Sequence, residues 1–182
     1  YRVSEGEAQE GGVRSFLHAS TEALTNVERA FNSGGKVSGI TTGLSDVNAK
    51  MGGLHRSDLL ILAGRPGMGK TSLATNIAFN AAHRYLRDME DGIAPEDSLG
   101  AKTVFFSLEM SADQLATRIL SEQAEISSEK LRMGAISRDD MHRLALASRE
   151  LQDLPLFIDD TPALTIAALR TRARRLQRRQ GI

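Results

Sequence analysis

The sequence contains no cysteine, which excludes disulfides, zinc-thiolate sites and a thiol nucleophile together. No apolar run approaches the length of about eighteen residues that suggests a membrane helix, and no signal peptide is visible, so we expect a soluble chain without a membrane partner. Lys plus Arg and Asp plus Glu number 23 each. Net charge therefore does not indicate a nucleic-acid partner, and charge must be interpreted locally. The 182 residues, 41% of them apolar, suit one domain with a sizeable core.

A glycine-rich stretch, Gly64-Arg65-Pro66-Gly67-Met68-Gly69-Lys70-Thr71, matches the phosphate-binding pattern G-x-x-x-x-G-K-[ST]. The apolar run 58–63 predicts a strand that ends at this loop. Residues 72–79 continue from it with helical spacing. The alternative is a glycine-rich turn that contains Lys-Thr by chance, but chance rarely places four fixed residue types together beside a strand and a helix.

The expected chemistry of this loop is the binding of a nucleotide polyphosphate. Its glycines let successive backbone N–H groups point inward, and a helix beginning near Gly69 adds the positive end of its dipole. Lys70 would contact the β- and γ-phosphates, and the Thr71 hydroxyl would ligate Mg²⁺. The candidate ATP-binding residues are Gly64, Arg65, Pro66, Gly67, Met68, Gly69, Lys70, Thr71 and Ser72.

The first part of the chain predicts a linker and a helix. Residues 1–14, rich in Gly and Glu, are typical of a flexible linker. From Phe16 to Asn32 apolar residues recur at helical intervals and form a narrow stripe on a polar rod. That stripe either packs on its own domain or docks on a neighbouring subunit.

Residues 103–108 are β-branched and aromatic, which predicts a buried parallel strand. Glu109 follows at its carboxyl end, and Ser111 with Gln114 predicts a capping box for the next helix. Ligands in an open α/β sheet lie outside the carboxyl ends of the strands. Glu109 is therefore either a base that accepts a proton from attacking water or a carboxylate favoured by the helix dipole.

The remaining pattern completes an α/β fold. Helices are predicted over 71–84, 112–123, 127–132, 138–151 and 164–179, with another strand at 156–160. The charged stretch 87–100, broken by Gly and Pro, predicts a surface loop. The last helix is rich in arginine and either follows a nucleic-acid backbone or forms a solvated or subunit-facing surface, which is the favoured interpretation. No aromatic residues alternate with these arginines for base stacking. They are Arg170, Arg172, Arg174, Arg175, Arg178 and Arg179.

These residues resemble the bacterial replicative DNA helicases of the DnaB type, whose motor domain has the RecA fold. The stretches that carry the resemblance are G-I-T-T-G-L-S-D-V-N, G-R-P-G-M-G-K-T-S, V-F-F-S-L-E-M-S, P-L-F-I-D-D-T-P and L-R-T-R-A-R-R-L. Their order and approximate spacing agree over about residues 16–182. The resemblance implies a RecA-like phosphate-loop ATPase core over 36–182, preceded by a linker helix over 15–35.

The resemblance also implies roles for residues and partners. Lys70 and Thr71 would be the ATP and Mg²⁺ residues, and Glu109 would be the general base. The helix at 15–35 would dock on the next subunit of a hexameric ring. Single-stranded DNA, primase and a helicase loader would be partners of the intact protein, at the replication fork in the cytoplasm. The parent would hydrolyse ATP, while this chain alone would be weakly active.

Two stretches depart from the family pattern. The segment 85–102 is longer than the family would suggest. Residues 156–160 resemble a Walker B strand ending in an Mg²⁺-supporting Asp. In the family's order, however, they form the strand before Walker B, which we expect to follow Ile182. A metal-linked role for Asp159 or Asp160 is therefore the less favoured interpretation.

Other function classes remain open on the sequence alone. A non-motor ATPase of the RecA or KaiC kind would use ATP to control assembly or loading, and strand separation distinguishes it from a helicase. A small-molecule kinase would need a substrate lid, and nothing after Lys70 resembles one. A purely structural docking module is a further alternative.

Overall fold

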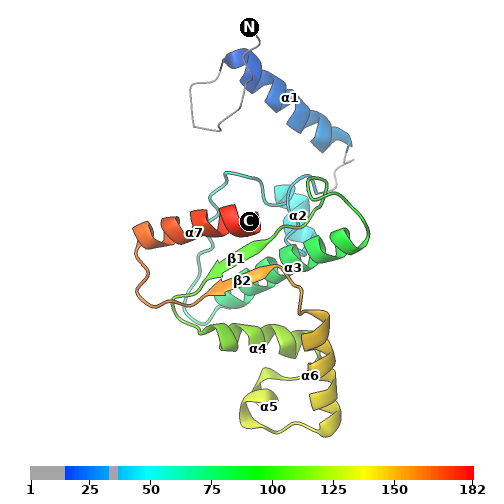
Figure 1. The fold of residues 1–182 in the computed structure, drawn as a ribbon, viewed down its shortest axis with the longest axis vertical. Coiled ribbons are helices and arrows are strands. Elements are labelled where there is room, and N and C mark those ends of the chain that lie inside the picture. Colours follow the sequence, from blue (N-terminus) through cyan, green and yellow to red (C-terminus); the bar gives the residue numbers. More distant parts are fainter. Residues whose placement is uncertain (1–14, 33–36) are drawn as a thin grey trace.

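The computed structural model describes residues 15–32 and 37–182, and the predicted linker at 1–14 lies outside these ranges. Short parallel strands lie among helices (Figure 1). The helices and strands are α1 (Phe16–Asn32), α2 (Ser45–Met51), α3 (Lys70–Glu90), β1 (Thr103–Phe106), α4 (Ala112–Gln123), α5 (Ser128–Met133), α6 (Arg138–Glu150), β2 (Leu156–Asp159) and α7 (Ile166–Gln180). None of the described helices is long and apolar enough to cross a membrane.

The parallel pair β1 and β2 forms the centre of the fold. Thr103 is opposite Leu156 and Phe106 is opposite Asp159, so both strands end together. Helix α3 contacts both strands. Its inward face is made of small and aromatic side chains, with Ala78, Phe79, Ala81 and Ala82 all buried. Removal of this apolar surface from water is what holds the helix on the sheet.

A second apolar cluster joins the helices between the strands. Ala124, Ile126 and Ala147 are buried, and side chains of α4, α5 and α6 with their connections pack around them. The capping box predicted for α4 is present, since the Ser111 N–H donates to Gln114 Oε1 at 3.1 Å. The helices predicted at 16–32 and 112–123 form with those bounds, and those at 127–132, 138–151 and 164–179 form within two residues of theirs.

The strand predicted at 58–63 does not form. This segment is extended, but no other part of residues 15–32 and 37–182 pairs with it. Its apolar side chains are exposed, Leu59 by 86% and Ile61 by 82%. The reason is that a strand needs a neighbour to satisfy its backbone N–H and C=O groups, and an apolar sequence cannot supply one.

The surface loop predicted at 87–100 is partly wrong, because α3 continues to Glu90. The buried Asp88 carboxylate then accepts hydrogen bonds from Arg84 Nε, Ser98 Oγ and the Leu99 N–H at 2.7 to 3.1 Å. Burial raises the pKa of the Asp88 carboxyl, but the bonds from Ser98 and Arg84 outweigh it and hold the pKa below its ordinary value. The loop therefore folds back along α3 instead of standing free in solvent.

Residues 39–48, whose letters carry part of the family resemblance, are fixed on α3. The Asn80 side chain donates to the Thr42 carbonyl at 3.0 Å, and Thr42 is fully buried. A Cβ at Gly43, where φ is +76°, would collide with the side-chain amide of Asn80. Only glycine meets both the left-handed conformation and this close approach.

Candidate functional site

The glycine-rich loop leads directly into α3. Gly67 and Gly69 have φ values of +75° and +80°, and Gly69 is the residue that precedes the first helical turn. A Cβ at either glycine would meet nothing within 4 Å. The requirement for glycine here is thus the left-handed backbone and not a lack of space.

Lys70 lies across the loop. Its Nζ donates to the Gly64 carbonyl at 2.9 Å and to the Arg65 carbonyl at 3.0 Å. Both bonds leave the positive charge uncompensated, since carbonyls carry only partial charges. A lysine held this way at a helix N-terminus offers a point charge to an anion.

The loop borders a hollow of about 440 Å³. The residues that line it are Leu62, Ala63, Gly64, Arg65, Met68, Gly69, Lys70 and Leu73. Thr71 and Ser72 are half-buried in the first turn of α3, while Pro66 is exposed. The structure therefore brings most of the predicted nucleotide residues around one hollow at the start of a helix.

Glu109 lies in the connection between β1 and α4, and its side chain is exposed. Its location follows from the path of the chain. The Ala101 N–H donates to the Ala81 carbonyl, and β1 then runs back along α3 toward the end where Lys70 lies. In Figure 1 the start of α3, the ends of β1 and β2, and the start of α4 lie toward the same side. The elements that carry Lys70 and Glu109 therefore begin or end on the same side of the β1–β2 pair.

Asp159 is committed to an ion pair. Its carboxylate accepts bonds from Arg172 Nη1 at 2.7 and 2.8 Å and from Thr161 Oγ1 at 2.7 Å. These contacts, that of Arg172 first, lower the pKa of the Asp159 carboxyl to about 2. In the part of the chain that the structure describes, no group of three His, Cys, Asp or Glu side chains could hold a metal ion. Asp159 thus serves the attachment of α7.

Sequence reasoning missed the contacts that three residues make at this edge. Ser107 is buried and exchanges hydrogen bonds with Met110, Asp160 Oδ2 accepts from the Ala112 N–H, and Arg172 binds Asp159. In the sequence, only the adjacent pair Asp159 and Asp160 attracted notice, as possible metal-linked carboxylates. The distances along the chain, such as 48 residues from Ala112 to Asp160, hide these pairs from any local pattern.

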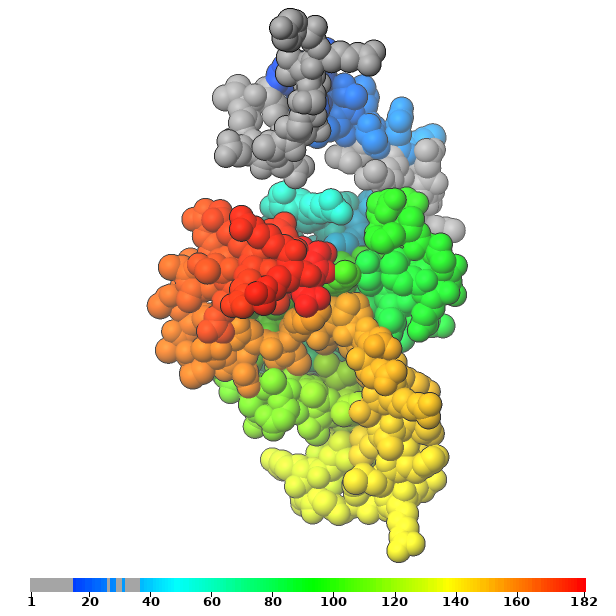
Figure 2. All heavy atoms as spheres, in the orientation of Figure 1, coloured from blue at the N-terminus to red at the C-terminus, as the bar shows by residue number. Residues whose placement is uncertain are grey.

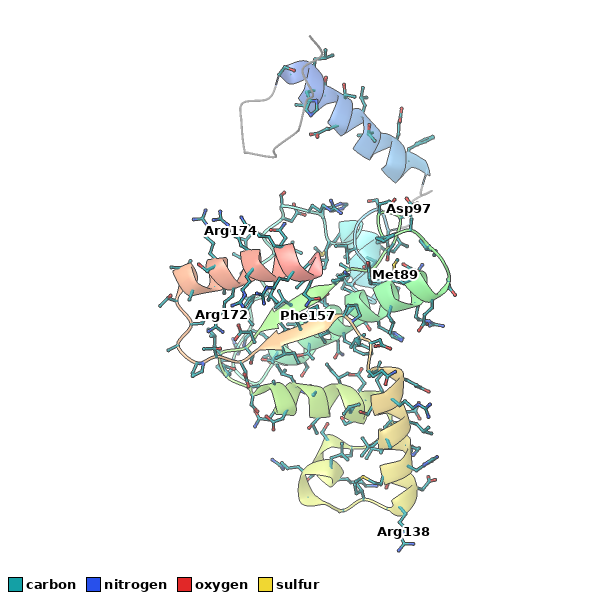
Figure 3. All side chains as sticks on the ribbon, viewed as in Figure 1. Met89, Asp97, Arg138, Phe157, Arg172 and Arg174 are labelled. Carbon is teal, nitrogen blue, oxygen red and sulfur yellow. The ribbon has the colours of Figure 1, made fainter. Side chains whose placement is uncertain are left out.

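The arginines of α7 divide into two groups. Arg172 is half-buried, whereas Arg170, Arg174, Arg175, Arg178 and Arg179 are exposed. Figure 3 shows Arg172 and Arg174 on opposite sides of the helix, with Arg172 toward the end of β2. Helix α7 lies uncovered on the face in Figure 2. Most of its positive charge is therefore available to a partner.

Comparison with protein families gives one matching description, the DnaB-like helicase C-terminal domain, over residues 39–182. Among curated proteins, the replicative DNA helicase DnaB of Rickettsia felis is 48% identical over 163 residues, which are 89% of this chain and 32% of that protein. The Rickettsia bellii protein of the same name is 47% identical over 99% of this chain and 35% of its own length. The Geobacillus stearothermophilus one is 33% identical over 94% and 35%. The chain thus spans about a third of the length of these relatives.

Two solved structures share the fold. One is an ATPase domain that superposes with a TM-score of 0.74 at 20% identity, covering 92% of this chain and 53% of that one. A DnaB-like replicative helicase, solved in a study of its interactions with primase, gives 0.69 at 20% identity and covers 94% and 37%. The predicted fold class is confirmed by this agreement.

Proposed function

The chain belongs to the family of DnaB-like helicase C-terminal domains, and from this we propose that it is the ATP-hydrolysing motor part of a replicative DNA helicase. Residues 15–35 would be the linker helix and 36–182 the amino-terminal part of the ATPase domain. The intact protein would work at the replication fork in the cytoplasm and couple hydrolysis to movement along single-stranded DNA. The resemblance of the chain to replicative helicases over 88% or more of its length supports this proposal.

The loop from Gly64 to Ser72 binds ATP in this proposal. The nucleotide's phosphates would lie against the N-terminus of α3, where backbone N–H groups and the helix dipole favour negative charge. The Lys70 ammonium would exchange its two carbonyl partners for phosphate oxygens, which carry full charge. The hollow of about 440 Å³ beside the loop is the observation that supports this placement.

Mg²⁺ fits the residues present. Mg²⁺ prefers oxygen ligands and takes part of its shell from substrate phosphates, so a hydroxyl beside the phosphates is a suitable ligand. Thr71, in the first turn of α3 next to Lys70, is the residue that would hold the ion. When bound, the ion would neutralise phosphate charge.

Hydrolysis requires a base, and we assign this role to Glu109. Its carboxylate would accept a proton from a water molecule as the water oxygen bonds to the γ-phosphorus. The bond from that phosphorus to the oxygen bridging the β-phosphate breaks, and ADP and inorganic phosphate leave. The exposure of the Glu109 side chain puts its carboxylate within reach of water.

Assembly into a ring is the proposed role of α1. Its apolar side chains are between 63% and 86% exposed. A row of exposed apolar side chains on one helix is typical of a surface that binds another protein. The exposed apolar residues of α1 are Phe16, Leu17, Leu24, Val27 and Phe31. A second copy of the chain, in a hexamer, would cover them. Primase, whose interactions with one structural neighbour have been studied, and a helicase loader would be further partners.

The observation that supports the proposal is that α3, which begins at Lys70, and the connection after β1, which contains Glu109, lie on the same side of the sheet in a DnaB-like domain. The test is ATP turnover and strand separation by the full-length gene product, with and without single-stranded DNA. Glu109→Gln should lower turnover by about 100-fold or more while ATP binding persists. Glu129→Gln, which removes an exposed carboxylate on α5, is the matched control and should leave turnover unchanged.

Turnover by Glu109→Gln at the rate of the unmodified protein would disprove the assigned base. DNA-stimulated ATP hydrolysis without strand separation would favour the rival function, a non-motor ATPase that controls assembly.

A further inference from the structure

The connections that follow β1 and β2 are tied to each other at the sheet edge. The Ser107 N–H donates to the Asp159 carbonyl at 2.9 Å and so extends the ladder past the end of β1. Five residues later, the Ala112 N–H donates to Asp160 Oδ2 at 2.8 Å. Glu109 lies between these two attachments, so the path of its backbone is fixed on both sides.

Ser107 closes the turn from inside. Its hydroxyl, in a side chain only 6% exposed, donates to the Met110 carbonyl at 2.6 Å and accepts from the Met110 N–H at 3.1 Å. A turn closed in this way directs the two residues within it outward. Leu108 is accordingly 68% exposed, and Glu109 is exposed as well.

Asp160 is itself held in place by its neighbours. The preceding Asp159 is bound by Arg172, and the following Thr161 donates its N–H and its hydroxyl to Asp159. The backbone on both sides of Asp160 therefore has little freedom. Because the Asp160 carboxylate is fixed relative to β2, its hydrogen bond also fixes the start of α4 relative to β2.

The hydrogen bond from the Ala112 N–H to Asp160 is not required to cap helix α4. Ser111 and Gln114 already form a capping box at the start of α4. A free N–H in the first helical turn is exposed enough here to bind water instead. The contact from a strand 48 residues away therefore contributes little to helix formation, and its main effect is on where the helix begins.

We propose that Asp160 and Ser107 are positioning residues that hold the Glu109 turn in the geometry for hydrolysis. This inference rests on the proposed function and adds to it the residues that set the location of the base. A displacement of about 1 Å at a reacting group can cost roughly 100-fold in rate. A large part of the rate enhancement from Glu109 should therefore depend on the rigid support of its turn.

The test uses the full-length gene product and measures kcat and KM for ATP. Asp160→Ala should lower kcat by roughly tenfold or more and leave KM within about twofold, because the phosphate loop is untouched. Asp160→Asn keeps an oxygen acceptor for the Ala112 N–H and should recover most of the rate. Asp113→Ala removes an exposed carboxylate from the same first turn of α4 and serves as the matched control.

Hydrogen exchange supplies a readout independent of activity. Asp160→Ala should speed exchange of the Ala112 amide and leave the unfolding temperature within a few degrees. Ser107→Ala, which retains the Asp160 contact, should show the same fall in kcat at constant KM. This second variant tests the inference even where Asp160→Ala folds poorly.

The inference is overturned if kcat stays within twofold in both variants, or if kcat, KM and the unfolding temperature change together as for a structural residue. A parallel measurement on Glu109→Gln distinguishes failure of the proposed base from failure of the positioning role. If that variant retains turnover, the proposed base is wrong. If it loses turnover and Asp160→Ala does not, only the positioning role fails.

Discussion

The two halves of the candidate site are held in different ways. The phosphate loop is fixed from within: Lys70 binds the carbonyls of Gly64 and Arg65, six and five residues away, and two glycines supply the left-handed backbone. The Glu109 turn is fixed from outside, by Asp159 and Asp160 on the neighbouring strand and just beyond its end. The loop that we propose to bind the nucleotide is thus determined locally, whereas the position of the turn with the proposed base depends on tertiary contacts.

Because of this difference, we expect nucleotide binding and ATP hydrolysis to depend on different contacts. The contacts that hold the loop are local, so changes elsewhere should have little effect on nucleotide affinity. The turn can take its shape only when β1 and β2 are paired, because both of its attachments are at the end of β2. Substitutions in the two halves should therefore act on KM and kcat in different proportions.

The largest effect is expected at Lys70. Lys70→Ala removes the full positive charge from the loop, and ATP turnover should fall by about 100-fold or more, with nucleotide affinity lowered as well. Turnover and fluorescent-nucleotide titration measure the two effects. Lys130→Ala, an exposed lysine on α5, is the control. Unchanged affinity in Lys70→Ala would place the nucleotide elsewhere.

A smaller effect is expected from backbone conformation alone. Gly67→Ala places a Cβ at a φ of +75° with free space around it, and the strain of about 1–2 kcal/mol should weaken nucleotide binding roughly tenfold. Gly92→Ala is a close control, since Gly92 has the same φ and equal space but lies beyond α3. Equal nucleotide affinity in both variants would show that the loop is not determined locally.

The smallest effect is expected on the pH dependence of protein stability. Arg172→Leu removes the partner of Asp159, whose folded-state pKa of about 2 lies below the ordinary 3.8. A lowered folded pKa stabilises the protein above pH 3.8, and this contribution is lost as pH falls toward 2. The unfolding temperature of the variant should therefore lie below that of the unmodified protein at neutral pH, with a gap that narrows in acid.

Arg170→Leu, an exposed arginine on the same helix, should show no such gap. A gap that stays constant from neutral pH down to the acid range would mean that Arg172 stabilises by packing alone.

The sequence predicted the helices and the loop well because their determinants are close along the chain. The spacing of apolar residues and the pair Ser111 and Gln114 located α4, and the glycines located the phosphate loop. The fold class and the family followed from the same local patterns. The roles of Lys70, Thr71 and Glu109 stay predictions until the experiments above are done.

The errors share a physical cause, which is dependence on distant partners. The run 58–63 has the composition of a buried strand, yet strand formation depends on a neighbour that no described residue provides. The end of α3 was placed too early because charged residues suggested a loop, whereas a buried Asp88 binds Ser98 ten residues on. A metal-linked role for Asp160 was the less favoured interpretation, and its partner in the structure, a backbone amide 48 residues away, could not be predicted from the sequence.

The exposed run from Leu59 to Leu62 also has a consequence for handling the protein. It presents unpaired backbone groups and contiguous apolar side chains, without proline, which are the features of segments that seed intermolecular β-pairing. Asp58 and Arg65 flank it as charged gatekeepers, but none lies within it. We therefore expect intermolecular β-pairing of this segment to promote aggregation of the 182-residue chain, and a charge introduced at Leu59 should reduce light scattering at high protein concentration.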